Sequence, residues 1–184
     1  MLTVREGRPA DFGLRSERER GVYDFLDRLG ISYRGVDHAP AHTMEDCLSA
    51  EEALGVTVCK NLLLANRQGT AHYLLLMPAG KPFRTKTLSA EIGTARLSFD
   101  TSDNLSRLLG TYPGAASVLG LIHDREKEIQ LLIDRDLLKE EYLGAHPLEN
   151  TTSLSLRLSD ILDIFLPAVG HCPVYVNLPA AAEE

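Results

Sequence analysis

Apolar residues recur at helical spacing close to the start of the chain. Ser16 and Glu19 form the S-x-x-E pattern of a capping box, which marks the beginning of a helix. The apolar positions that follow are Val22, Phe25, Leu26 and Leu29. Gly30 then supplies the residue type that commonly ends a helix. The pattern therefore predicts a helix between Ser16 and Gly30 with one apolar face.

The middle of the chain changes to continuous apolar runs, which are typical of buried strands. Two runs, at Lys60 to Ala65 and Ala71 to Met77, are separated by a short polar loop that contains Gly69, and this arrangement predicts an antiparallel hairpin. Composition and turn residues predict further extended segments at 31–36, 95–99, 117–122 and 128–133, and helices at 43–54 and 102–109.

Near the C-terminus, Leu154, Leu156 and Leu158 alternate with polar residues, as in an edge or half-exposed strand. Ser159 is then expected to cap an apolar helix that ends near Gly170, and 173–178 to return as a last strand. Helices at both ends of a series of strands indicate an α+β fold. We expect a single domain over 1–184, with a curved mixed, largely antiparallel sheet flanked by helices and a short polar tail at 180–184.

The composition fits one globular domain and excludes several classes of protein. The chain has 184 residues, 44% of them hydrophobic, and a formal net charge of −7, so it is not a generally basic protein that coats nucleic acid. Its apolar runs fall far short of the roughly 20 residues of a membrane-spanning helix, and no signal peptide is readable. The three cysteines form no C-x-x-C pair, which favours buried thiols in a cytoplasmic chain.

Familiar catalytic motifs are absent from the chain. It contains no G-x-x-x-x-G-K-[ST] and no G-x-G-x-x-G between a strand and a helix, which disfavours a nucleotide hydrolase or a Rossmann enzyme. Ser117 has no G-x-S-x-G motif around it and is not expected to be a nucleophile. His38 and His42 have a metal-ligand spacing, but Pro40 argues against the helix that would align them, so solvated or hydrogen-bonded histidines are favoured.

Lys60 is the sharpest local anomaly in the pattern. On a strand it shares a face with Val58, Leu62 and Leu64, so its ammonium projects from an otherwise apolar surface. A buried, unpaired charge is costly, and the group should therefore meet an anion, a carbonyl or the mouth of a cavity. The alternative is a side chain that extends to solvent at a sheet edge. The pattern alone leaves both interpretations open.

Positive charge is concentrated in the middle of this acidic chain. The segment from Lys60 to Arg107 carries seven basic and three acidic residues. Within it, Lys81, Arg84 and Lys86 surround Phe83 in a predicted loop. Cations around an aromatic ring suit the binding of phosphates and of a stacked base. Solvated loop charges are the alternative.

Two further loops are candidates for contact with a ligand. The turn from Gly110 to Gly114 precedes an apolar segment, and glycine there lets a ligand approach the backbone N–H groups closely. The segment from His146 to Ser153 concentrates polar groups that could recognise a small polar substrate. Ordinary loops whose side chains cap the backbone are equally consistent with both patterns.

Four segments together resemble one family. They are Cys59-Lys60-Asn61-Leu62-Leu63-Leu64, Tyr73-Leu74-Leu75-Leu76-Met77-Pro78, the Pro113-Gly114 turn before Ser117-Val118-Leu119-Gly120-Leu121, and His146-Pro147-x-x-Asn150-Thr151. In this order, from about Val22 to Val169, the chain is similar to the YbaK and prolyl-tRNA synthetase insertion-domain family. The last segment points to the freestanding Ala-tRNA(Pro) deacylase branch of that family.

The resemblance implies a trans-editing hydrolase that deacylates mischarged tRNA(Pro), with Ala-tRNA(Pro) as the expected substrate. In this family a ribose hydroxyl of the substrate is thought to assist the attacking water, so neither a metal nor an organic cofactor is implied. The implied partner is the acceptor end of tRNA(Pro), with prolyl-tRNA synthetase or an elongation factor as further candidates. The chain is expected to be a monomer or a homodimer with no membrane association.

The same resemblance implies roles for particular residues. Lys60 would hold the terminal phosphate or the substrate carbonyl, and Gly114 would belong to the catalytic loop around the aminoacyl group. Contacts to the substrate are implied for Asn61, Ala115, Ala116, Ser117, His146 and Asn150, and contacts to tRNA for Lys81, Arg84 and Lys86. The family loop commonly reads Gly-x-x-x-Pro, whereas this chain has Val118 at the last position.

Two other functions stay open at this point. A noncatalytic module that binds tRNA or a protein partner on the same fold would keep the basic segment but hydrolyse no ester. A deacylase for another small residue, such as Cys or Ser, would differ in the volume of its pocket, which a sequence does not specify.

Overall fold

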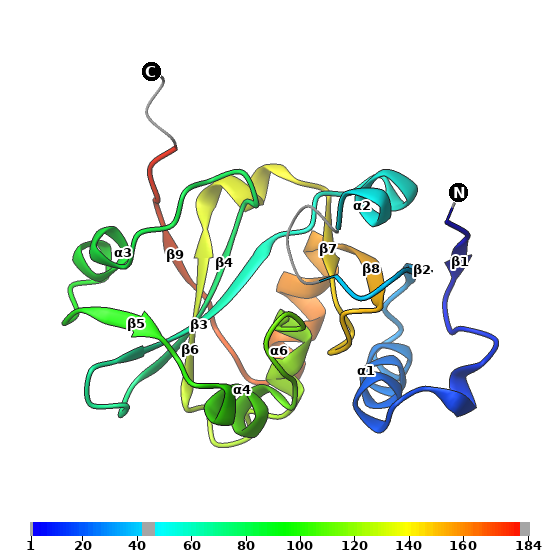
Figure 1. Cartoon of the computed structure of the whole chain (residues 1–184), viewed down its shortest axis with the longest axis horizontal. Helices are drawn as coiled ribbons and strands as arrows, with labels where there is room; N and C mark the ends of the chain where they lie inside the picture. The colour runs from blue at the N-terminus through cyan, green and yellow to red at the C-terminus, as the bar shows by residue number, and fades with distance from the viewer. Residues whose placement is uncertain (1, 42–46, 181–184) are drawn as a thin grey trace.

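The computed structural model describes residues 2–41 and 47–180, whose strands form two sheets (Figure 1). One is antiparallel throughout and has the order β1 (Val4–Glu6), β2 (Tyr33–Asp37), β8 (Thr152–Arg157), β7 (Tyr142–Ala145). The other is mixed and has the order β5 (Leu97–Phe99), β3 (Lys60–Asn66), β4 (His72–Met77), β6 (Ile129–Asp134), β9 (Val174–Val176). The predicted α+β class is confirmed, with the strands divided between two sheets that an isolated bridge from Val58 to Gly144 connects.

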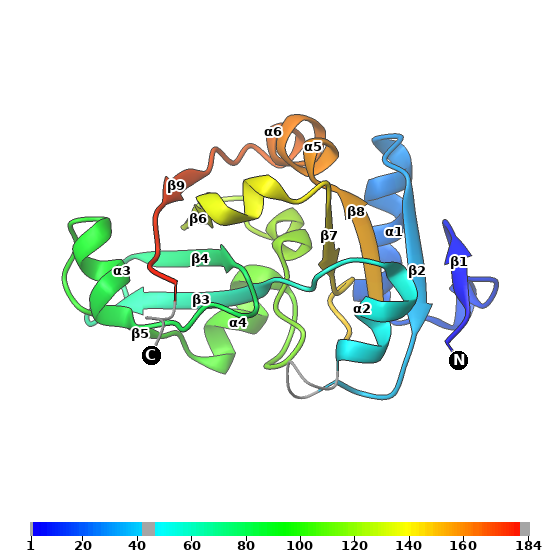
Figure 2. The same ribbon diagram turned by 90° about the horizontal axis from the view of Figure 1, so that it is seen from above.

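Helices flank both sheets. Helix α1 (Glu17–Arg28) begins as predicted, because the Ser16 side chain accepts a hydrogen bond from the Glu19 N–H. The other helices are α2 (Leu48–Leu54), α3 (Thr85–Glu91), α4 (Ser102–Leu109), α5 (Leu158–Asp160) and α6 (Leu166–Ala168), with a π-helical turn at Ile161–Phe165 and 3-10 turns at Phe12–Leu14, Val118–Ile122 and Arg135–Lys139. Figure 2 shows α1 and α2 at the end of the molecule with the antiparallel sheet, and α3 at the opposite end. No helix in the described ranges is long and apolar enough to cross a membrane.

Strand β4 explains why the middle of the chain reads as continuous apolar runs. Side chains alternate between the two faces of a strand. Leu74 and Leu76 belong to the main core between sheet and helices, whereas Leu75 and Met77 pack in a second cluster with Leu88 of α3. All four side chains are fully buried. Both faces of β4 are therefore covered, as they are for strands with uninterrupted apolar sequence.

The structure differs from the predicted elements at 117–122. This segment is a 3-10 turn instead of a strand, because the Ser117 hydroxyl accepts a hydrogen bond from the Leu119 N–H at 3.2 Å and caps it. Gly120 then packs so closely on the end of α4 that an added Cβ would lie 2.8 Å from the Leu109 carbonyl oxygen. Tertiary packing of this kind is not visible in the local pattern.

The C-terminal prediction also needs correction. Strand β8 is central, between β2 and β7, so its polar residues Ser153 and Ser155 are as buried as its leucines. The helical segment starts at Leu158, and Arg157 rather than Ser159 is its N-cap residue. The predicted start of the helix at 43–54 and the end of the polar tail at 180–184 lie outside the described residues.

Candidate functional site

A cavity of about 320 Å³ lies where the start of β3, the turn at Gly114 and the end of β7 meet. Its walls are mostly small or apolar, and they are formed by Ala41, Cys47, Val58, Cys59, Lys60, Asn61, Leu62, Gly114, Ala116, Ala145 and His146. The volume is at the lower end of the range for small-ligand pockets, roughly 300–1,000 Å³. The fold thus gathers the predicted residues Lys60, Asn61, Gly114, Ala116 and His146 around one small cavity.

Lys60 lies at the mouth of this cavity. It is the first residue of β3, half-buried, and it pairs with Met77 of β4. Its Nζ donates a hydrogen bond to the Lys81 carbonyl oxygen at 2.6 Å. A carbonyl orients the ammonium without cancelling its charge, so this contact leaves the positive charge and two further N–H groups for a ligand.

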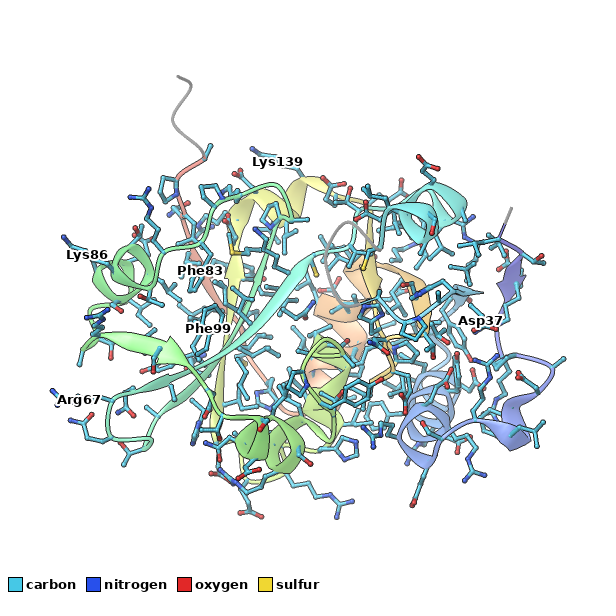
Figure 3. All side chains as sticks on the ribbon, viewed as in Figure 1. Asp37, Arg67, Phe83, Lys86, Phe99 and Lys139 are labelled. Atoms are coloured by element: carbon cyan, nitrogen blue, oxygen red, sulfur yellow. The ribbon has the colours of Figure 1, made fainter. Side chains whose placement is uncertain are left out.

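A second groove continues from the cavity. It has a volume of about 510 Å³, and it shares Lys60 and Leu62 with the cavity. Its remaining lining residues are Phe83, Arg84, Thr85, Lys86 and Phe99. The rings of Phe83 and Phe99 meet edge to face with 5.8 Å between centroids, and Phe99 is 63% exposed. Figure 3 shows both rings beside β3, toward α3. The groove therefore combines accessible aromatic surface with three cations, Lys60, Arg84 and Lys86.

Lys81 is not part of this groove. Its side chain is buried, and its Nζ lies 2.8 Å from an Asp134 carboxylate oxygen and 2.6 Å from one of Asp136. The same Nζ donates a hydrogen bond to the Leu178 carbonyl oxygen at 2.7 Å. The predicted tRNA contact from an exposed Lys81 is therefore wrong, because its ammonium is already satisfied inside the protein. Arg84 and Lys86, by contrast, line the groove.

Asn61 connects β3 to the loop after Gly114. Its Nδ2 donates a hydrogen bond to the Cys59 carbonyl oxygen at 3.1 Å, and its Oδ1 accepts one from the Val118 N–H at 2.9 Å. Proline has no N–H group, so the second bond requires a residue other than proline at position 118, as valine is here. Asn61 lines the cavity, but these two bonds anchor the loop.

Gly114 shapes the loop through its backbone. Its φ is +93°, a conformation that favours glycine. Space is not the constraint, because an added Cβ would lie 3.8 Å from the nearest atoms. Gly114 and Ala116 line the cavity, but Ala115 and Ser117 are fully buried and do not. The Ala115 N–H donates a hydrogen bond to the Tyr112 carbonyl oxygen at 3.0 Å. The predicted substrate contacts of Ala115 and Ser117 are corrected to structural roles in the loop.

His146 forms a buried wall of the cavity. Its Nδ1 lies 2.8 Å from the Thr152 carbonyl oxygen. A carbonyl only accepts, so we assign the hydrogen to Nδ1, and Nε2 is the acceptor in the neutral ring. Burial lowers the pKa of His146, which favours this neutral form. The ring centroid of His38 is 6.0 Å away, and His38 Nε2 lies 2.9 Å from the Ser153 hydroxyl.

Asn150 connects two segments beside the cavity through hydrogen bonds of its side chain. It is buried but is not among the lining residues. Its Nδ2 donates to the Ala41 carbonyl oxygen at 3.1 Å, and its Oδ1 accepts from the Tyr112 hydroxyl at 3.0 Å. Asn150 thus links Ala41 to the Gly114 turn, and its predicted contact with the substrate stays a prediction. Sequence reasoning missed Tyr112 because nothing local signals the partner of its hydroxyl.

The cysteines divide between the cavity and the surface. Cys47 and Cys59 are buried and line the cavity, while Cys172 is exposed, which corrects the expectation that all three are buried. Burial raises the pKa of the Cys59 thiol to about 11, so the thiol stays protonated at neutral pH and is a poor nucleophile. Within the described residues no three His, Cys, Asp or Glu side chains are grouped to hold a metal ion, and His42 lies outside those residues.

Comparison with known proteins gives a consistent result. Residues 38–164, more than half of the chain, match the model of the aminoacyl-tRNA editing domain family. The prolyl-tRNA editing protein ProX of Acetoanaerobium sticklandii is 29% identical over 145 residues, which cover 79% of this chain and 88% of that protein. Prolyl-tRNA synthetase associated domain-containing protein 1 of Danio rerio is 26% identical over 170 residues, covering 91% of this chain and 89% of that protein.

The fold is shared with solved structures of low sequence identity. The structure of a candidate trans-editing enzyme for prolyl-tRNA synthetase superposes with a TM-score of 0.66 at 17% identity. The superposition covers 90% of this chain and 99% of the other. The two proteins therefore share the same fold.

Proposed function

The chain belongs to the aminoacyl-tRNA editing domain family, and we propose that it is a deacylase that removes alanine from mischarged tRNA(Pro). The name of the ProX relative, a prolyl-tRNA editing protein, supports tRNA(Pro) as the tRNA. One observation carries the proposal. A small cavity and a basic, aromatic groove meet at Lys60, so an aminoacyl group and the nucleic acid that carries it have adjoining places.

We propose that the cavity takes the amino-acid side chain. A synthetase pocket built for proline cannot strongly reject the smaller alanine, since each methylene contributes only about 1–3 kcal/mol of discrimination. A second pocket that admits a methyl group and excludes the proline ring supplies the missing selectivity. The walls suit this task because Val58, Ala145 and His146 are buried and belong to the packed junction of the two sheets.

The ester needs no protein nucleophile, because it is already activated. Water attacks the carbonyl carbon, the bond to the ribose oxygen breaks, and that oxygen leaves with a proton. Lys60 would stabilise the developing oxyanion or the adjoining phosphate. Gly114 and Ala116 are the loop residues that line the cavity, and their backbone N–H groups would be the further donors. A neighbouring ribose hydroxyl of the substrate would assist the water, as the family resemblance implies.

The groove would hold the acceptor end next to the terminal adenosine. Arg84 and Lys86 supply positive charge for phosphates in a chain whose net charge is −7. Phe83 and Phe99 present aromatic surface on which an unpaired base can stack, an interaction of about 1–3 kcal/mol per base. The groove thus supports a substrate that is larger than a free amino-acid ester.

The test is to incubate the protein with tRNA(Pro) charged separately with Ala, Cys, Ser and Pro, and to follow loss of the amino acid. We expect rapid deacylation of Ala-tRNA(Pro) and little of Pro-tRNA(Pro). Preference for Cys or Ser would replace the proposed substrate by another small residue. Absence of hydrolysis with all four, together with retained tRNA binding, would contradict the deacylase and favour a binding module.

A further inference from the structure

We propose that Lys81 is a positioning residue that fixes the ammonium of Lys60, through the buried ion pair that Lys81 forms with Asp134 and Asp136. The inference rests on the proposed function, in which Lys60 is the catalytic cation. It gives a role to a buried charge that the deacylation scheme does not otherwise use.

The contact between the two lysines is short and local to the turn after β4. Lys60 Nζ donates a hydrogen bond to the Lys81 carbonyl oxygen at 2.6 Å. The Lys81 N–H in turn donates to the Pro78 carbonyl oxygen at 3.2 Å, one residue beyond Met77, the strand partner of Lys60. The position of the Lys60 ammonium thus depends on where this turn places one carbonyl group.

The side chain of Lys81 fastens that turn to the rest of the molecule. Its Nζ lies 3.0 and 2.8 Å from the two carboxylate oxygens of Asp134, whose side chain is 1% exposed at the end of β6. It also reaches Asp136 at 2.6 Å and the Leu178 carbonyl oxygen, beyond β9, at 2.7 Å. The turn after β4 is therefore held to two other segments by one ammonium.

The charges around the pair are divided in a way that suits catalysis. Asp134 and Asp136 face Lys81, and Lys139 also pairs with Asp136 at 2.6 Å. Burial opposes the charged form of Lys81, but hydrogen bonds to both carboxylates more than compensate and raise its pKa, so it stays charged. The carboxylates neutralise Lys81, whereas within the described residues Lys60 Nζ contacts a carbonyl oxygen and no carboxylate. The catalytic cation is oriented while its charge is kept.

The experiment compares deacylation of Ala-tRNA(Pro) by the wild type and by the double variant Lys81→Met, Asp134→Asn. Replacing both residues avoids leaving a buried carboxylate unpaired, and the introduced amide keeps an oxygen for the Asp136 N–H, which now donates to Asp134 at 3.0 Å. Thermal unfolding first establishes that the variant folds. We expect kcat to fall at least about tenfold with KM changed less than about twofold, because small displacements of a catalytic group are costly.

Three further variants separate positioning from stability. Lys81→Arg keeps a positive charge at position 81 to pair with Asp134, and this variant should retain most of the wild-type kcat. Lys139→Met removes the other cation that pairs with Asp136. Because Lys139 lies outside the turn after β4, this variant should leave kcat unchanged. In a Lys60→Ala background the double variant should cause no additional loss, since Lys81 acts through Lys60.

Two results would overturn the inference. One is a folded double variant with the wild-type kcat. The other is a double substitution that lowers kcat by the same factor in the Lys60→Ala background as in the wild-type background. A wild-type protein that hydrolyses none of the charged tRNAs contradicts the proposed function instead. The positioning claim is then decided by the crystal structure of the double variant. Lys60 Nζ displaced from the residue-81 carbonyl oxygen supports it, and an unmoved Lys60 Nζ refutes it.

Discussion

Two lysines in the same basic segment have opposite roles, and their partners determine which role each one takes. Lys60 meets a carbonyl at the mouth of a cavity and keeps its charge available, whereas Lys81 meets two carboxylates and is neutralised. From the sequence, Lys60 was identifiable because it interrupts an apolar strand face. The sequence pattern groups Lys81 with the tRNA contacts because Asp134 and Asp136 lie far along the chain, and no local pattern indicates a long-range ion pair.

At the same scale, His146 is predicted to set the size of the cavity. Replacing it by alanine removes a buried wall, so bulkier aminoacyl groups should enter. In His146→Ala the ratio of single-turnover rate constants for Ala-tRNA(Pro) and Pro-tRNA(Pro) should fall by about 10- to 100-fold, as expected for a steric contact of about 1–3 kcal/mol.

The matched control for this variant is His171→Ala, which removes a buried histidine that does not line the cavity. It should leave the ratio unchanged. If His146→Ala lowers both rate constants equally, His146 positions the transition state and is not a size filter. If it changes neither rate constant, His146 has no part in the site.

At the scale of elements, predictability follows burial and local capping. The runs of β3 and β4 and the capping box of α1 were correctly predicted, because their pattern alone determines them. The 3-10 turn at Val118–Ile122 and the helix α3 were not, since the turn also packs through Gly120 on Leu109 of α4, and α3 packs on β4. Leu88 of α3, for example, packs against Leu75 and Met77 of β4.

The groove beside α3 leads to a prediction about salt dependence. Arg84 and Lys86 line it and are the proposed phosphate contacts. For wild type, log Kd for uncharged tRNA(Pro) should rise with log salt concentration between about 50 and 200 mM, because bound counterions are released. In the double variant Arg84→Ala, Lys86→Ala, this slope should fall by about 0.7 for each single-strand phosphate that the protein no longer neutralises.

Arg67→Ala is the matched control, because Arg67 is an exposed cation at the tip of the β3–β4 hairpin and does not line the groove (Figure 3). Its slope should equal that of the wild type. Equal slopes for all three proteins would mean that the groove cations are solvated surface charges that bind no phosphate.

At the scale of the whole molecule, the site lies where the two sheets meet. The bridge between Val58 and Gly144 brings β3 of one sheet next to β7 of the other, and the cavity is lined from both. The sequence predicts a single sheet and most of its strands. It does not predict the junction of two sheets, because that depends on the order in which the strands pair in space. The contacts behind the cavity, such as the hydrogen bond from the Tyr112 hydroxyl to Asn150, therefore cannot be predicted from the sequence.

Buried histidines should make the stability of the fold depend on pH. Burial lowers the pKa of His146 and of His171 below the ordinary value, which is about 6.5. Between about 6.5 and their lower folded pKa values, the unfolded chain binds more protons than the folded one. The contribution of these two histidines to the free energy of unfolding is therefore fully present above about pH 6.5 and decreases as the pH falls below it.

The measurement is Tm as a function of pH between about 7.5 and 5.5. Titrating carboxylates contribute to the same slope, so the comparison is with the double variant His146→Gln, His171→Gln. Its Tm should change less with pH than that of the wild type. Identical pH slopes would show that neither histidine is linked to unfolding in this range.

The proposed deacylation depends on Lys60 as the cation that promotes ester hydrolysis. The most direct test is the single-turnover rate of Ala-tRNA(Pro) deacylation by Lys60→Ala, with thermal unfolding to establish that the variant folds. We expect a Tm within a few degrees of the wild-type value and a rate reduced by about 10²- to 10³-fold, as for the loss of one oxyanion-stabilising group. A folded Lys60→Ala protein that deacylates Ala-tRNA(Pro) at the wild-type rate would contradict the role of Lys60.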